Sequence, residues 1–117
     1  MKKSIIYLGL ALTLTLSSFA ANNTSNYHYD PLCIAISKND NETAKKMIAY
    51  GANVNDRYNG ITPLMYAARY NNVEMLKELL NNGADLSLKD SRGNTALKFA
   101  ELSNAKEAIE FLKSVKK

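Results

Sequence analysis

The feature that most constrains how this chain folds is an internal repeat. Residues 31–55 align with residues 63–87 at an offset of 32, and a further copy follows at an offset of 33. The copies keep prolines, small residues and glycines in register: Pro31 with Pro63, Ala35 with Ala67, Gly51 with Gly83, and Gly60 with Gly93. A period of this length is typical of a small unit that cannot bury its apolar face alone and is stabilised by stacking on its neighbours.

The first half of each copy is predicted to be a short helix. Thr62 supplies a side-chain oxygen for the free N–H groups of a helix start, and Pro63 suits the first helical position because it has no N–H. Leu64, Ala67 and Ala68 then follow at i, i+3 and i+4. This spacing indicates one narrow apolar face, and its small alanines allow a neighbouring helix to approach closely.

The second half is predicted to be another helix, separated from the first by a polar break at Asn71 and Asn72. Its apolar positions again have helical spacing: Val73, Leu76, Leu79 and Leu80. Gly83 stands where this helix should end, because glycine accepts the left-handed backbone of a helix cap. The tips of hairpin-like turns are expected at two dipeptides: Asn59-Gly60 and Arg92-Gly93.

The repeated segments resemble the ankyrin-repeat family. Residues 60–68 (GITPLMYAA) are similar to its G-x-T-P-L-H-x-A-A signature, and residues 83–87 (GADLS) resemble its G-A-D-V-N ending. The resemblance covers about residues 27–117. It implies an all-α solenoid of about three helix-turn-helix repeats with short hairpin-like loops. The repeats are expected at about residues 27–58, 59–91 and 92–117.

One position departs from the family pattern. The signature histidine, which in the family hydrogen-bonds around the threonine of the same motif, is replaced by Cys33, Met65 and Lys98 in the three copies. We expect the fold to survive because the threonine cap remains. We also expect a modest loss of stability.

The first residues have the order of a secretory signal peptide. Lys2 and Lys3 precede an uncharged apolar run of 12 residues, 5–16, and small residues follow it. The run is shorter than the roughly 20 residues that span a bilayer, which disfavours a membrane anchor. We expect residues 1–20 to be a signal peptide cleaved after Ala20 and residues 21–26 to be a polar linker. The Lys-Lys start and the Asn- and Lys-rich composition favour a bacterial, periplasmic protein.

Composition argues against nucleic-acid binding and catalysis. Removing residues 1–20 lowers Lys+Arg from 15 to 13 against 11 Asp+Glu, so the net charge falls from +4 to about +2. A net charge this small does not predict the basic surface patch that nucleic-acid binding requires. The chain has one histidine, and its carboxylates are scattered over helix positions expected to be exposed, so no catalytic set is apparent. His28 and Cys33 would supply two metal ligands at most, short of a four-ligand zinc site.

The resemblance also implies a contact surface, because the family uses its hairpin tips and the outer side of its first helices to bind partners. The corresponding positions in the second and third copies are Tyr58, Asn59, Ile61, Tyr66, Arg69, Tyr70, Ser91, Arg92, Asn94, Phe99 and Leu102; the first copy offers Ile34, Ser37 and Lys38. Tyr and Arg are enriched at interface hot spots. The alternative is that Tyr66 and Phe99 pack between repeats and that Tyr58 is only a loop residue.

These observations predict a monomeric, non-catalytic protein-binding module without a cofactor, a nucleic-acid partner or, after cleavage of the signal, a membrane contact. Its partner is expected to be an envelope enzyme or toxin that it inhibits, shields or stabilises, as a self-protection protein would. The alternative is an accessory protein that handles haem or a metal in support of an oxidative-stress enzyme, with His28 and Cys33 as ligands.

Overall fold

The computed structural model describes residues 30–116, so the predicted signal peptide, the linker and His28 lie outside the described residues. The described part is a series of six helices: α2 (Pro31–Ser37), α3 (Asn41–Ala49), α4 (Pro63–Arg69), α5 (Val73–Asn81), α6 (Ala96–Leu102) and α7 (Lys106–Val115). Within these residues β structure is limited to one isolated bridge between Tyr58 and Ile61. The predicted all-α fold is confirmed.

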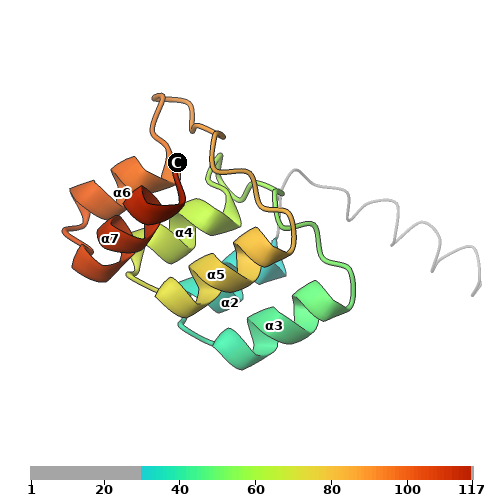
Figure 1. Cartoon of the computed structure of the whole chain (residues 1–117). Helices are drawn as coiled ribbons and strands as arrows, with labels where there is room; N and C mark the ends of the chain where they lie inside the picture. The colour runs from blue at the N-terminus through green and yellow to red at the C-terminus, as the bar shows by residue number, and fades with distance from the viewer. Residues whose placement is uncertain (1–29, 117) are drawn as a thin grey trace, which may run out of the picture.

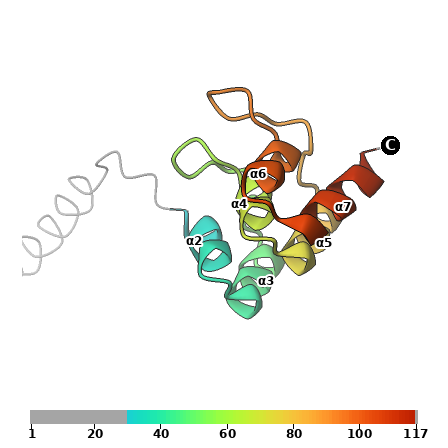
Figure 2. The same ribbon diagram turned by 90° about the vertical axis from the view of Figure 1, so that its left-hand side faces the viewer.

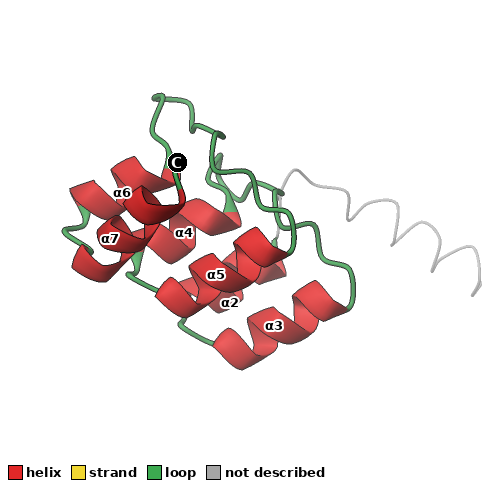
Figure 3. Cartoon of the chain, viewed as in Figure 1, coloured by secondary structure: helices red, strands yellow, loops and turns green. Residues whose placement is uncertain are grey.

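The helices lie in two rows (Figure 1). The first helices of the pairs, α2, α4 and α6, form one row, in which α4 packs against both of its neighbours. The second helices, α3, α5 and α7, form the other row, with α5 in the middle. The two long loops, coloured green and orange in Figure 2, extend from the same side of the stack, and Figure 3 shows that no helix interrupts them.

The predicted helix starts are confirmed by their caps. The Thr62 hydroxyl accepts a hydrogen bond from the Met65 N–H at 3.3 Å, and Asp30 accepts one from the Leu32 N–H at 2.9 Å. Pro31 and Pro63 occupy the first helical turn. Local sequence therefore determines where the first helices begin, because each cap satisfies N–H groups that the helix itself leaves free.

The predicted apolar face of the first helix is also confirmed. Leu64, Ala67 and Ala68 are fully buried, each at most 1% exposed. The small alanines lie where α4 is flanked by α2 and α6, so the helices of this row pack closely. Three further residues of α4 are buried as well: Pro63, Met65 and Tyr66. The middle repeat therefore has the most thoroughly buried helix.

The buried face of α5 differs from the prediction. Leu76 and Leu79 are fully buried as expected, but Met75 is buried with them, whereas Val73 and Leu80 are only half-buried. The reason is that α5 contacts three helices, α3, α4 and α7. A helix with three neighbours buries a wider and differently centred face than the narrow stripe that simple periodicity predicts.

Left-handed residues end the helices. Gly83 has φ +94°, as predicted for the residue after the second helix. The turns between the helices of a pair each contain a left-handed asparagine, which the sequence did not predict: Asn39, Asn71 and Asn104, with φ of 60°, 56° and 55°. Asparagine adopts this conformation more readily than other non-glycine residues because its side chain hydrogen-bonds locally.

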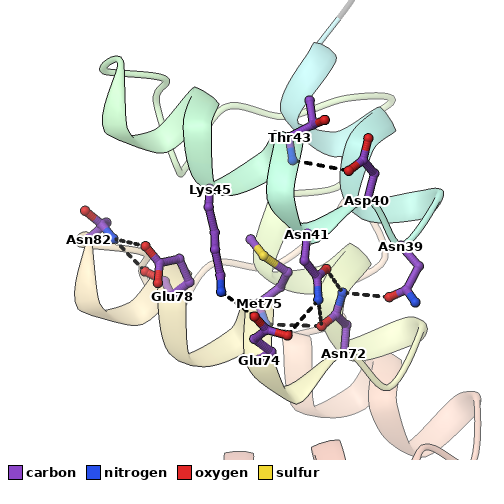
Figure 4. A network of polar contacts seen from close by, with 10 residues as sticks. All are labelled: Asn39, Asp40, Asn41, Thr43, Lys45, Asn72, Glu74, Met75, Glu78 and Asn82. Atoms are coloured by element: carbon purple, nitrogen blue, oxygen red, sulfur yellow. Dashed lines mark hydrogen bonds and ion pairs between the residues drawn. The ribbon is translucent and has the colours of Figure 1, made fainter.

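Polar side chains connect the first two repeats at these turns (Figure 4). The Asn72 amide donates to the side-chain oxygens of Asn39 at 3.1 Å and Asn41 at 2.6 Å. The Asn41 amide in turn donates to Glu74 at 3.0 Å, and Lys45 forms an ion pair with the same carboxylate. The stack is thus held by apolar burial within it and by a side-chain network at its edge.

Candidate functional site

A groove of about 510 Å³ opens between the two loop tips and the first helices of the second and third repeats. Its lining residues come from the first tip, the end of α4, the second tip and α6. It is lined by Asn59, Gly60, Ile61, Arg69, Asp90, Ser91, Arg92, Asn94, Phe99, Leu102 and Ser103. The groove therefore spans two repeats and exists only when they are stacked.

The structure brings together most of the residues predicted from the sequence as contacts. Eight of them line this groove: Asn59, Ile61, Arg69, Ser91, Arg92, Asn94, Phe99 and Leu102. Gly60, Asp90 and Ser103 line it as well and were not among the predicted contacts. The first-repeat positions Ile34, Ser37 and Lys38 are not part of it.

The three tyrosines lie elsewhere. Tyr66 is only 7% exposed, and its hydroxyl donates a hydrogen bond to the Tyr58 carbonyl at 3.2 Å. The rings of Tyr58 and Tyr66 are 6.3 Å apart between centroids. Tyr66 is thus a core residue that supports the first loop, and its predicted role as an exposed contact is corrected. Tyr70 is 47% exposed and lies beside Arg69, whose guanidinium carbon is 5.9 Å from the ring centroid.

The first tip is a tight two-residue turn. Tyr58 and Ile61 exchange both backbone hydrogen bonds, at 2.9 and 3.1 Å. Asn59 and Gly60 between them have φ of 53° and 78°. Two consecutive left-handed residues are typical of the hairpin turn that Asn-Gly favours, so the predicted tip is confirmed.

The two loops are joined by one arginine. The Arg57 Nη1 donates to the Gly60 carbonyl of its own tip at 3.1 Å and to the Lys89 carbonyl of the next loop at 2.8 Å. Asn55 forms a similar link near the beginning of the two loops, where its side chain donates to the Gly83 carbonyl and accepts from the Asp85 N–H. These contacts define the spacing of the two sides of the groove.

The second tip is held by its own carboxylate. Asp90 Oδ1 accepts from the backbone N–H groups of Arg92 at 2.9 Å and Asn94 at 2.8 Å, and Oδ2 accepts from the Asn94 amide at 3.2 Å. These hydrogen bonds, the backbone one from Asn94 first, lower the pKa of Asp90. Phe99 occupies the repeat position of Tyr66 but has no hydroxyl, so this tip has a different support from the first.

The groove combines positive charge with apolar surface. Within residues 30–116, neither Arg69 nor Arg92 has a side-chain hydrogen bond or an ion pair. Ile61 and Phe99 are half-buried in the groove, and Leu102 is 67% exposed. The site therefore presents two guanidinium groups that have no acceptor within residues 30–116, one of them beside the Tyr70 ring, next to apolar side chains. This combination suits recognition of another molecule.

Cys33 has the environment of a core residue. It is 1% exposed, and its thiol donates to Asp30 Oδ2 at 3.2 Å. Burial, followed by the hydrogen bond that the thiol donates to Asp30 and by the charge of that carboxylate, raises the pKa of the thiol. Among the residues that the structure describes, no group of three or more His, Cys, Asp or Glu side chains is placed to hold a metal ion. No helix in the same residues is long and apolar enough to cross a bilayer.

Comparisons with known proteins identify the repeat. A family model described as ankyrin repeats (3 copies) matches residues 9–90 and 32–117. An ankyrin repeat protein of Rickettsia bellii is 32% identical over 98 residues, which is 78% of this chain and 58% of that protein. An ankyrin repeat protein of Acanthamoeba polyphaga mimivirus is 36% identical over 74% of this chain and 13% of its own length. The human transient receptor potential cation channel subfamily A member 1 is 37% identical over 74% of this chain and 8% of its length.

Proposed function

Because the chain belongs to the ankyrin-repeat family, a non-catalytic fold that binds other proteins, we propose that it is a periplasmic binding protein whose groove between the loop tips holds one protein partner. The partner is an envelope enzyme or toxin, which the protein inhibits, shields or stabilises. The observation that carries the proposal is the groove itself, which gathers residues from two repeats around two arginines that form no ion pair within residues 30–116. The chain spans between 8% and 58% of the length of the three relatives described above, so what they do as whole proteins is said of them alone.

Export is supported by the sequence of residues 1–20. Lys2 and Lys3 precede an apolar run of 12 residues with small residues after it, which is the order that secretion signals have. Cell fractionation of the expressed full chain followed by N-terminal sequencing tests this part. A periplasmic product that begins at Ala21 is expected. A product retained in the cytoplasm with Lys2 and Lys3 still present would contradict it.

The size of the binding surface is compatible with a specific complex. Standard protein interfaces bury about 800 Å² on each partner. The groove lies on the second and third repeats. A partner seated in it that also covers the first helix of the first repeat would bury roughly 600–800 Å² on this side. This is sufficient for one partner of ordinary size.

The decisive experiment is partner capture with matched variants. Tagged protein expressed in its own host is cross-linked in the periplasm, and the attached proteins are identified by mass spectrometry. The groove variant carries Arg69→Ala, Arg92→Ala and Leu102→Ser. The control variant carries Lys106→Ala, Lys113→Ala and Tyr50→Ser, which remove two cations and one exposed apolar side chain outside the groove.

We expect a single envelope protein to be captured by the wild type and by the control, and to be lost from the groove variant. All six substituted side chains are exposed, so both variants should keep the fold. Circular dichroism checks this. Equal recovery of the same partner by the wild type and the groove variant would show that another surface binds it.

A further inference from the structure

The charges and apolar side chains of the groove point to the chemistry of what fills it. We propose that the occupant is an acidic, apolar segment of the partner protein, in which an Asp or Glu lies close to an aliphatic or aromatic residue. This inference rests on the proposed function, since it concerns the same groove and the same kind of partner. It goes further because it specifies which side chains the groove selects.

The first step is the state of the two arginines. Arg69 lies at the end of α4 and Arg92 at the second tip, and both are exposed. Neither guanidinium has an acceptor within residues 30–116. An arginine offers five N–H donors in a planar fork that matches a carboxylate with two parallel hydrogen bonds. The groove therefore holds donors for an acceptor that the described part of the chain does not supply.

The second step is the carboxylate already present. Of the residues that the structure describes, Asp90 is the only acidic one that lines the groove. Its two oxygens accept three hydrogen bonds from its own loop, and it forms no ion pair with Arg92. Counting Arg69, Arg92 and Asp90, the lining has a net charge of +1. The groove thus favours a negatively charged occupant even with Asp90 ionised.

The third step is the apolar surface between the charges. Phe99 and Leu102 lie on α6, and Ile61 lies beside the first tip. A free anion such as phosphate would leave these side chains in contact with water, whereas a protein segment with an apolar residue would cover them. Burial of apolar surface contributes roughly 25 cal/mol per Å². The mixed lining therefore favours a segment of protein over a simple anion.

The experiment selects short random peptides, displayed on phage, against purified full chain. We expect enriched peptides to carry Asp or Glu within a few positions of an apolar residue. A synthetic enriched peptide should bind about tenfold more weakly or worse when its acidic residue is changed to the amide, because a charge-assisted hydrogen bond is lost. The double variant Arg69→Gln and Arg92→Gln should weaken it to a similar degree or more. The control variant Lys106→Gln and Lys113→Gln should not.

Four results would overturn the inference. Three of them are enrichment of peptides without acidic residues, binding that does not depend on either arginine, and no enrichment at all. Displacement of the peptide by an equal concentration of inorganic phosphate would show a simple anion site and would also overturn it. These failures are distinct from failure of the proposed function. A partner captured in the periplasm through the groove, but without an acidic segment, leaves the proposed function in place. If acidic peptides bind the groove but no envelope protein is captured, the proposed function is refuted and this inference is not.

Discussion

The side-chain oxygen of Asn71 accepts a hydrogen bond from the backbone N–H of Ala108, at 2.9 Å, and so caps the first turn of α7 from the preceding repeat. The residue before α7 is Ala105, which has no side-chain group for this purpose. The Asn71 amide also donates to the Glu107 carboxylate at 2.6 Å. One asparagine therefore follows the first helix of one repeat and caps the second helix of the next.

Replacement of Asn71 by alanine should destabilise the protein by about 2 kcal/mol, of which about 1 comes from the lost cap and about 1 from the left-handed backbone at φ 56°. Asn71→Gly loses the cap without the backbone strain, so it should lose only about 1 kcal/mol. Urea unfolding followed by circular dichroism measures both variants. Equal stabilities of alanine variant, glycine variant and wild type would disprove the capping role.

Tyr66→Phe should loosen the first loop while leaving the core intact. The change removes only the hydroxyl that donates to the Tyr58 carbonyl. We expect a loss of about 1 kcal/mol and faster amide hydrogen exchange at Ile61, whose N–H pairs with the same residue. Tyr70→Phe, which removes a hydroxyl without a hydrogen bond in residues 30–116, is the control and should change neither. Unchanged exchange at Ile61 in Tyr66→Phe would contradict the role of the hydroxyl.

Gly83→Ala should destabilise the protein by about 1 kcal/mol or more, because of backbone strain alone. Gly83 has φ +94°, and a Cβ placed on it would meet no atom within 4 Å. Gly83→Asn should therefore recover part of the loss, since asparagine tolerates this region better than alanine. Thermal unfolding of the two variants checks the order. An alanine variant as stable as the wild type would show that the backbone relaxes there.

Stability should fall in acid, partly through Glu74. Hydrogen bonds from Lys45 and then Asn41 lower the pKa of Glu74 from its usual 4.5. Because the pKa is lower in the folded state, the stabilisation is fully present above the unfolded value and is lost as the pH falls through the folded one. Urea midpoints measured from neutral to acid pH should decline less steeply for Glu74→Gln than for the wild type. The control is Glu101→Gln, which removes the same charge from a residue without these partners and should leave the decline as it is in the wild type. An identical decline of the urea midpoint in the wild type and in Glu74→Gln would refute the linkage.

Cys33 should not react with thiol reagents in the folded protein. The thiol is 1% exposed, and burial raises its pKa, whereas the reactive form is the exposed thiolate. Labelling is expected only in urea, at the rate of the unfolded chain. A Ser91→Cys variant in a Cys33→Ala background places a thiol on the exposed second tip and should label at once. Rapid labelling of the native wild type would contradict the buried position.

Much of the fold could be predicted because its signals are local. Thr62 and Pro63 determine where α4 begins, and Gly83 marks the residue after α5, through caps and backbone preferences that need no distant partner. Arg69 and Arg92 could be placed on one surface because the family resemblance assigns both kinds of position, the end of a first helix and a hairpin tip, to the contact side of the stack. The groove itself could not be predicted, since its shape depends on how the two loop tips lie relative to α4 and α6 in the stack.

Tyr66 shows where reasoning from one helical face was insufficient. It lies off the face of Leu64, Ala67 and Ala68, but the first loop covers it, and the hydroxyl finds the Tyr58 carbonyl. A signal was present: the same repeat position holds Ile34, Tyr66 and Phe99, all large and largely apolar. A repeated large residue of this kind is more typical of packing than of a variable contact.

Met65 and Asn71 show a second limit. The Met65 sulfur, at the position of the family's histidine, accepts from the Thr62 N–H at 3.5 Å, an interaction that residue type alone does not suggest. The expected modest loss of stability at this position stays a prediction. The partner of Asn71 lies 37 residues further along the chain. No local rule pairs a turn asparagine with a helix at that separation, so only the stacked structure reveals it.

The Arg57 bridge between the Gly60 and Lys89 carbonyls has a thermodynamic consequence for recognition. Loops that are already fastened to each other lose little conformational entropy when a ligand arrives, so more of the contact energy remains as affinity. Because the loops are rigid, the protein tolerates little variation in the shape of its ligand. A ligand must match the gap as it stands, and cutting the bridge with Arg57→Ala should make the protein bind more kinds of ligand, each less tightly.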